Sequence, residues 1–186
     1  KKWIILDRDG TLIVDKNYLG NPLVVELLPN VSEGLLRLAR FGYKFVVVSN
    51  QSGVGRGYFT KNDMDAVNKR VSELLLSGGV AIEGFYSCPH LPEEKCLCRK
   101  PEIGLVESAA KELNFRFDEV LCVIGDKESD IKLASNIGAM SLLLATGYGE
   151  HEYDRGIRGT YFAQDMLGAS DLLISLAKDD IVGQNN

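Results

Sequence analysis

Short, continuous apolar runs alternate along this chain with longer stretches in which apolar residues recur at helical spacing. The runs that predict buried strands are Trp3 to Leu6, Phe45 to Val48, Gly84 to Ser87, Val120 to Ile124 and Ser141 to Leu144. The stretches that predict helices are Ser32 to Phe41, Thr60 to Leu76, Ile103 to Leu113, Asp130 to Asn136 and Gln164 to Ala177. This alternation predicts an α/β fold, a Rossmann-like parallel sheet in three layers with helices on both faces.

We expect one domain over residues 1–186, because two domains sharing this length would each be small. The tail from Asp179 to Asn186 is expected to fray. The net charge is −5, from 21 Lys and Arg against 26 Asp and Glu, and no basic run is present. This acidic balance argues against nucleic-acid and membrane-surface partners. The apolar runs are too short for a membrane span or a signal peptide, so we expect a cytoplasmic protein.

Polar clusters follow three of the predicted strands at the point where each strand ends. Asp7 and Asp9 follow the first strand, Ser49 follows the second, and Asp126 and Asp130 follow the strand at Val120. In a parallel sheet, ligands bind outside the carboxyl ends of the strands, so these side chains could converge on one site. A lone Asp-x-Asp is often a solvated turn, but three strand ends together disfavour that interpretation.

Carboxylates gathered in this way suit a magnesium-assisted phosphate transfer. Mg²⁺ prefers oxygen ligands, and together with a lysine it neutralises the charge of a phosphoryl group. A carboxylate can attack phosphorus and form an aspartyl phosphate, while a neighbouring carboxylate protonates the leaving oxygen and then deprotonates water. Asp7 and Asp9 are the candidates, and Gly10 lets the backbone turn closely around the phosphate.

The same residues resemble the four motifs of the haloacid-dehalogenase superfamily of phosphatases. The motifs are matched in order by Asp7-Arg8-Asp9-Gly10-Thr11, by Ser49, by Lys100, and by Asp126 with Asp130. The resemblance implies that Asp7 is the nucleophile and that Asp9 is the general acid and base. It implies that Ser49 and Lys100 hold the phosphoryl oxygens. It further implies that Mg²⁺ is held by Asp7, the backbone carbonyl of Asp9 and Asp126, with Asp130 orienting the loop.

Members of this superfamily often carry an inserted cap domain over the site. Here 37 residues separate Thr11 from Ser49, and they already supply a helix and a strand. The 50 residues between Ser49 and Lys100 are filled by a helix, a strand and a cysteine-containing loop. We therefore expect no large cap, with specificity set by loops.

The segment 88–98 predicts a structural zinc site. Its candidate ligands are Cys88, His90, Cys96 and Cys98. Three thiolates and one imidazole are a ligand set of closed, tetrahedral zinc sites. A disulfide or unrelated surface cysteines are the alternatives. Zinc would stiffen the loop that carries Arg99 and Lys100. The fourth cysteine, Cys122, lies within an apolar strand and is expected in the core.

The Cys-x-His and Cys-x-Cys-Arg-Lys-Pro pattern resembles the subfamily that contains heptose bisphosphate 7-phosphatases and histidinol-phosphate phosphatases. The cysteine loop is short, as in the histidinol phosphatases, whereas the stretches Asn50 to Phe59 and Asp15 to Tyr18 look like those of the heptose enzymes. Lys16, Arg56, Arg99 and Lys127 could neutralise a second phosphate. The substrate-binding residues that we expect are Asp15, Tyr18, Asn50, Gln51, Ser52, Arg56, Arg99 and Lys127.

The predicted function is therefore removal of the 7-phosphate of a heptose 1,7-bisphosphate, with histidinol phosphate as the alternative substrate. Two other classes compete with it. A nucleic-acid 3′-phosphatase would need a basic groove, which the net charge of −5 disfavours. A non-catalytic metal-bound scaffold would be expected to lack Asp7, Asp9 or Lys100, and all three are present. The expected partner is a small phosphorylated sugar; the sequence leaves the oligomeric state open, with a monomer favoured.

Overall fold

The computed structural model describes the backbone of residues 1–183 and the side chains of residues 1–179. Within this part, one sheet contains six strands, and every pairing in it is parallel. In spatial order the strands are β3 (Gly84–Cys88), β2 (Lys44–Asn50), β1 (Trp3–Leu6), β4 (Val120–Gly125), β5 (Met140–Leu144) and β6 (Tyr161–Ala163). The predicted strands and the Rossmann-like fold class are confirmed. β6 was not predicted, because three residues are too few to show a periodic pattern.

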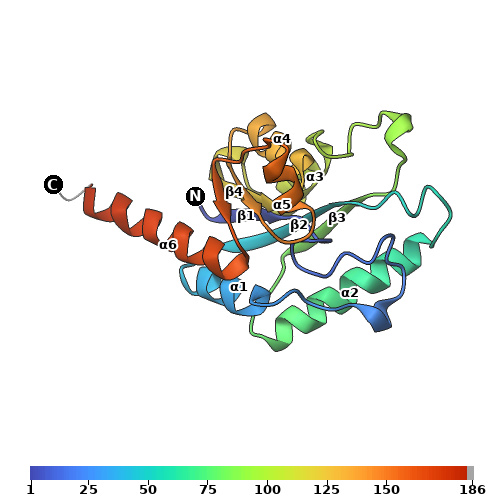
Figure 1. Cartoon of the computed structure of the whole chain (residues 1–186), viewed down its shortest axis with the longest axis horizontal. Coiled ribbons are helices and arrows are strands. Elements are labelled where there is room, and N and C mark those ends of the chain that lie inside the picture. The colour runs from blue at the N-terminus through green and yellow to red at the C-terminus, as the bar shows by residue number, and fades with distance from the viewer. Residues whose placement is uncertain (184–186) are drawn as a thin grey trace.

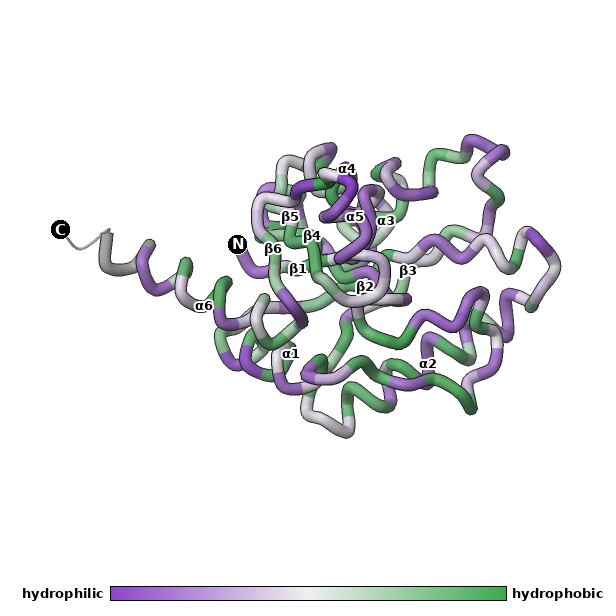
Figure 2. The backbone as a smooth tube through the Cα atoms, viewed as in Figure 1, coloured by the Kyte–Doolittle hydropathy of each residue, from purple (hydrophilic) through white to green (hydrophobic). Residues whose placement is uncertain are grey.

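The helices cover both faces of this sheet, as predicted (Figure 1). They are α1 (Val31–Arg40), α2 (Lys61–Ser77), α3 (Gly104–Leu113), α4 (Glu128–Asn136), α5 (Gly149–Asp154) and α6 (Met166–Gly183). Successive side chains of a strand point to opposite faces, which divides the core in two. Ile4 and Leu6 pack with residues of α1, α2 and α6, whereas Trp3 and Ile5 pack with residues of α3 and α4. Figure 2 shows the hydrophobic strands at the centre of the molecule.

The sequence located the start of α2 correctly but placed the end of α6 too early. The start of α2 is a capping box in which Thr60 Oγ1 accepts from the Asp63 backbone N–H at 3.1 Å, as the sequence indicates. The end of α6 was predicted wrongly, since the helix continues over 179–183 where fraying was expected. No glycine or proline interrupts the chain between Gly168 and Gly183, so nothing stops the helix earlier. Residues 184–186 of the expected tail lie outside the described residues.

The position of β1 and β4 decides where a ligand site can form. These strands are neighbours at the centre of the sheet, and the strand order reverses between them. Such a switch point leaves a crevice at the carboxyl ends of the strands. The described residues include no large cap over this edge: between β1 and β2 lie loops, a short 3-10 helix and α1. No helix in the described part of the chain combines the length and apolarity that a membrane crossing requires.

Candidate active site

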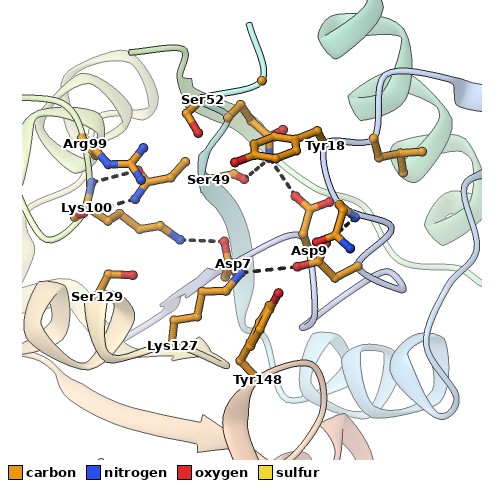
Figure 3. Close-up of a pocket in the computed structure, with 16 residues that line it drawn as sticks. Asp7, Asp9, Tyr18, Ser49, Ser52, Arg99, Lys100, Lys127, Ser129 and Tyr148 are labelled. Atoms are coloured by element: carbon orange, nitrogen blue, oxygen red, sulfur yellow. Dashed lines mark hydrogen bonds and ion pairs between the residues drawn. The ribbon is translucent and has the colours of Figure 1, made fainter. Parts of the chain in front are cut away.

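Asp7 is the first residue after β1 and lies almost fully buried at the switch point. Its backbone N–H still donates to the Ile124 carbonyl of β4, at 2.9 Å, so the sheet itself positions this carboxylate. Lys100 comes from the loop between β3 and α3, and its ammonium group donates to Asp7 Oδ1 at 2.6 Å and to Asp130 Oδ1 at 2.7 Å. Figure 3 shows the Lys100 side chain extended toward Asp7, with a dashed line marking their contact.

Asp126 completes a group of three carboxylates that is built to receive a cation. Ligand oxygens of Asp7, Asp126 and Asp130 all lie within 4.8 Å of one another. Asp126 Oδ2 accepts from the Tyr148 backbone N–H at 2.8 Å, but Asp126 Oδ1 is buried without a hydrogen-bond partner. A buried carboxylate oxygen without a donor is costly, and a bound cation removes that cost.

The backbone of two glycines packs directly against the Asp126 carboxylate, where a side chain would not fit. A Cβ atom added at Gly10 or at Gly147 would lie 2.2 Å from Asp126 Oδ2. Both residues also have positive φ values, 83° and 57°, which side chains disfavour. The backbone therefore approaches this carboxylate closely in a way that only glycine permits.

The pKa shifts in this cluster have the pattern of a site short of positive charge. Burial raises the pKa of Asp126 to about 8, and the negative charge of Asp7 adds to the rise. Burial also raises the pKa of Asp130 to about 6, against the opposing effect of Lys100. For Asp7, burial acts upward, but the ammonium groups of Lys100 and Lys127 outweigh it and the pKa is lowered. Oxygen donors in this arrangement fit a hard divalent cation such as Mg²⁺.

Asp130 also helps to shape the loop at the end of β4. Its Oδ2 accepts from the Lys127 backbone N–H at 3.1 Å in a capping arrangement at the start of α4, while its Oδ1 accepts from Lys100. The orienting role that we expected for Asp130 agrees with these contacts. An oxygen of Asp130 also belongs to the carboxylate cluster, so Asp130 is close enough to contact a bound cation directly.

Asp9 lines the same pocket as Asp7, with its side chain 16% exposed. Gln51 Nε2 donates to Asp9 Oδ2 at 2.7 Å and to Ser49 Oγ at 2.6 Å. Gln51 thereby links Ser49, at the end of β2, to Asp9. Gln51 was expected among the substrate-binding residues; it lines the pocket, and its amide nitrogen is engaged by two protein oxygens.

Asn50 has a comparable structural task next to Gln51. Its side-chain Nδ2 donates to the Lys100 carbonyl at 3.1 Å, and its Oδ1 accepts from the Lys100 backbone N–H at 2.9 Å. This pair of hydrogen bonds ties the loop before α3 to the end of β2. Asn50 lines the pocket, as predicted for a substrate-binding residue, and it also fixes the backbone that carries the Lys100 ammonium group.

The pocket over these residues has a volume of about 360 Å³. The expected substrate-binding residues that line it are Asp15, Tyr18, Asn50, Gln51, Ser52, Arg99 and Lys127. Arg56 is not among the lining residues; its guanidinium lies over the Tyr18 ring, 5.6 Å from the centroid. Sequence reasoning missed Ser129 and Tyr148, which also line the pocket. Tyr148 follows β5, so extending the strand-end argument to that strand could have found it.

Lys127 and Tyr148 form one side of the pocket, away from Tyr18 (Figure 3). The Lys127 ammonium lies 4.9 Å from the centroid of the Tyr148 ring and 3.6 Å from Asp15 Oδ2. Burial acts to lower the pKa of Lys127, but the charges of Asp7 and Asp126 outweigh it and raise the pKa. Lys127 therefore stays a cation, available to an anionic ligand, at any physiological pH.

The four predicted zinc ligands come together in the loop after β3. The sulfur atoms of Cys88, Cys96 and Cys98 lie 3.2 to 3.5 Å apart, and His90 Nδ1 lies 3.2 Å from Cys98 Sγ. A zinc tetrahedron with metal–sulfur bonds of about 2.3 Å has edges of about 3.8 Å, close to these separations. The thiols are free, and Cys122 lies apart in the core as expected. The donor set and its spacing fit zinc.

Comparison with known proteins places this geometry among phosphatases. The family described as "Polynucleotide kinase 3 phosphatase" matches residues 2–129, and the one described as "HAD-hyrolase-like" matches residues 97–169. A D-glycero-beta-D-manno-heptose-1,7-bisphosphate 7-phosphatase of Helicobacter pylori is 38% identical over 78% of this chain and 83% of its own length. One of the same name from Pseudomonas putida is 32% identical over 90% of this chain and 96% of its own length.

Two further comparisons bear on the substrate. The bifunctional histidine biosynthesis protein HisB of Legionella pneumophila is 37% identical over 74% of this chain, but the match spans only 40% of that protein. Among solved structures, the D,D-heptose 1,7-bisphosphate phosphatase of B. bronchiseptica, complexed with magnesium and phosphate, has a TM-score of 0.86 and 29% identity. That superposition covers 94% of this chain and 99% of the other.

Proposed function

This chain belongs to the haloacid-dehalogenase-like phosphatases, and from that premise we propose that it removes the 7-phosphate of a heptose 1,7-bisphosphate through a phosphorylated Asp7. The observation that carries the proposal is the buried contact of Asp7 with Lys100, at 2.6 Å, next to two further carboxylates. The lowered pKa of Asp7 keeps it an anion at neutral pH. An anionic carboxylate at the floor of an open pocket is the form that attacks phosphorus.

The reaction needs three further residues of this chain. Lys100 and Ser49 line the pocket beside Asp7 and would hold the phosphoryl oxygens, which lowers the charge that the incoming carboxylate meets. Asp9 would give a proton to the leaving sugar oxygen as the bond from that oxygen to phosphorus breaks. Asp9 would then take a proton from the water that attacks phosphorus and releases Asp7.

The residues that would hold Mg²⁺ are Asp7, Asp126 and the backbone carbonyl of Asp9. When bound, Mg²⁺ supplies positive charge that neutralises the phosphoryl group in the transition state. The unpartnered Asp126 Oδ1 and the close glycine backbone support this assignment. The relative from B. bronchiseptica was solved with magnesium and phosphate, which supports Mg²⁺ as the ion.

Magnesium affinity is expected to rise with pH up to about 8. At neutral pH the metal-free Asp126 is largely protonated, because burial and Asp7 raise its pKa to about 8. Mg²⁺ binds the carboxylate and must displace that proton, so the affinity should increase about tenfold per unit below pH 8 and level off above it. Calorimetric titration in buffers of different ionisation enthalpy would measure the proton released. A flat affinity between pH 6 and pH 8 would contradict this assignment.

The substrate is proposed from the charge of the pocket and from the relatives. Lys100, Arg99 and Lys127 line one pocket of about 360 Å³. Lys100 is paired with Asp7, which leaves Arg99 and Lys127 as the cations that could bind a second phosphate. The 7-phosphate would meet Asp7 and Lys100, and the other phosphate would meet Arg99 or Lys127. Relatives named as heptose 1,7-bisphosphate 7-phosphatases match this chain over most of their own length. Histidinol phosphate is the second candidate, favoured by the short cysteine loop and the HisB relatives.

Steady-state kinetics would separate these candidates. We expect kcat/KM for a heptose 1,7-bisphosphate to exceed that for histidinol phosphate by about 100-fold, because the monophosphate leaves the half-buried cations Arg99 and Lys127 without a second phosphate to bind. Both anomers of the heptose bisphosphate and a 3′-phosphorylated oligonucleotide should be included. Arg99→Leu should lower kcat/KM for the bisphosphate more than for the monophosphate. A preference of the natural chain for histidinol phosphate or for the oligonucleotide would reassign the substrate.

Zn²⁺ is proposed as a structural ion held by Cys88, His90, Cys96 and Cys98. Four protein ligands leave no open position for water, which argues against a catalytic zinc. The loop that carries these ligands continues directly into Arg99 and Lys100, and Arg99 Nη1 donates back to the His90 carbonyl at 3.4 Å. The ion would thus stabilise the segment that presents two cations to the substrate.

The remaining proposals concern the chain as a whole. We propose that residues 1–186 form one catalytic domain, since all strands of the described residues belong to one sheet. We propose a cytoplasmic enzyme whose partner is a small phosphorylated sugar. A monomer is the favoured state, and light scattering of the purified protein would test it.

A further inference from the structure

Arg8 lies between the two catalytic aspartates in sequence, and its side chain is completely buried. Its guanidinium contacts both oxygens of Asp9: Nε donates to Oδ2 at 3.0 Å and Nη2 donates to Oδ1 at 3.3 Å. Nη2 also donates to Gln51 Oε1 at 2.8 Å. Burying an arginine is costly unless its donors are satisfied, so a buried guanidinium next to a reacting group calls for an explanation.

The third nitrogen of the Arg8 guanidinium, Nη1, donates to a residue far away in the sequence. Asn68, 60 residues later on α2, accepts from Arg8 Nη1 through its Oδ1 at 2.7 Å. Asn68 is 6% exposed and does not line the pocket, so it does not reach a substrate. Its amide nitrogen makes only a long contact with Ser87 Oγ, at 3.5 Å. The short hydrogen bond to Arg8 is thus its principal polar contact.

The two carboxylate oxygens of Asp9 accept different numbers of hydrogen bonds. Oδ2 accepts from Arg8 Nε and, at 2.7 Å, from Gln51 Nε2, whereas Oδ1 accepts only the longer 3.3 Å contact from Arg8. Two planar groups, the guanidinium and the amide, therefore fix the plane of this carboxylate. The less engaged oxygen, Oδ1, remains free to carry a proton.

We propose that Asn68 and Arg8 are positioning residues for Asp9, and that Asp9 Oδ1 is the oxygen that exchanges protons with the substrate and water. This inference rests on the proposed phosphatase function. In the first step a carboxylate oxygen of Asp7 bonds to phosphorus as the bond from phosphorus to the leaving oxygen breaks, and the proton on Asp9 moves to that leaving oxygen. In the second step a water proton returns to Asp9 while the water oxygen bonds to phosphorus and the bond to Asp7 breaks. Asn68 holds Arg8, and Arg8 holds the carboxylate in the orientation that both steps need.

Substituting Asn68 tests this proposal through the leaving group. A sugar oxygen needs a proton to leave, whereas p-nitrophenolate leaves without one. With Asn68→Leu, which removes the acceptor at similar volume, we expect kcat/KM for the sugar bisphosphate to fall by about tenfold or more. We expect kcat/KM for p-nitrophenyl phosphate to change by less than about threefold.

The second step provides an independent readout. Attack of water on the phosphorylated Asp7 needs Asp9 for every substrate, so this step should become limiting in Asn68→Leu. Rapid mixing with p-nitrophenyl phosphate should then show a burst of about one p-nitrophenol per enzyme, larger than in the unaltered protein. A general loss of folded protein would lower both substrates equally and would give no enlarged burst.

Two further variants serve as controls. Val71→Ala removes buried volume on the same face of α2 without touching Arg8, so it should lower stability and leave the ratio of the two substrates unchanged. Asn68→Asp retains an acceptor for Arg8 and should restore the ratio toward that of the unaltered protein. If Asn68→Leu does not fold, Asn68→Ser, whose short hydroxyl does not reach Arg8, replaces it in both assays.

The outcomes separate this inference from the proposed function. Equal losses for the two substrates in Asn68→Leu, without a burst, would overturn the positioning role while the unaltered enzyme still hydrolyses phosphate esters. If the unaltered protein with Mg²⁺ hydrolyses neither substrate, the phosphatase proposal itself fails, and the positioning role with it.

Discussion

Replacing Asp7 with asparagine is expected to lower kcat by about 10⁴-fold or more while the protein stays folded. The amide cannot attack phosphorus, so no aspartyl phosphate can form. Stability should change little, because two effects oppose each other. The buried Lys100 ammonium loses one of its two carboxylate partners, at 2.6 Å, but a repulsion inside a group of three carboxylates is also relieved.

The measurement is steady-state hydrolysis combined with mass analysis of acid-quenched enzyme. The unaltered protein should show a phosphorylated form during turnover, and Asp7→Asn should show none. Asp171→Asn, an exposed change on α6 that touches only the surface ion pair with Arg37, is the matched control and should retain full activity. Turnover of Asp7→Asn within about tenfold of the unaltered enzyme would eliminate Asp7 as the nucleophile.

Replacing Cys98 with serine is expected to remove zinc and to lower stability and substrate binding together. Structural zinc sites contribute folding free energy directly, so we expect a loss of about 3–5 kcal/mol and a fall of about 10 °C in Tm. The same change should raise KM for the bisphosphate, because Arg99 and Lys100 follow Cys98 directly. Zinc content by elemental analysis, Tm and KM should be measured on the same preparation.

A matched control distinguishes loss of zinc from loss of any thiol. Cys122 is buried in β4, outside the cysteine loop, and Cys122→Ala should keep one zinc per chain. Its Tm can fall because a small core cavity is formed, but KM should not change. Unaltered Tm and KM in a verified zinc-free Cys98→Ser protein would show that the loop does not depend on the ion.

Much of the fold could be predicted because the elements have clear local patterns. The strands at Trp3 and Val120 are continuous apolar runs, and α2 begins with Thr60 and Asp63 in a capping pattern that the structure reproduces. β6 could not be predicted, because a strand of three residues shows no periodic pattern. The end of α6 was placed too early, because no residue near Asp179 signals where the helix stops.

The candidate site divides in the same way. Asp7, Ser49 and Asp126 could be proposed as partners because the carboxyl ends of parallel strands meet at one edge. Arg56 was expected to bind substrate because of its charge; it is not among the lining residues, and its guanidinium lies over the ring of Tyr18, which does line the pocket. Asn68 carried no signal, because a polar residue on a helix is ordinarily a solvent-exposed one.

By itself, the sequence determined the kinds of group available and the order of the elements that present them, since both follow from nearby residues along the chain. Only the tertiary structure decided which groups meet. The pairing of Leu6 with Ile124 sets Asp7 beside Asp126, and the packing of α2 brings Asn68 within 2.7 Å of Arg8. Such contacts join residues 60 or more positions apart. They depend on how whole helices and strands pack together, and a local sequence pattern carries no information about that packing.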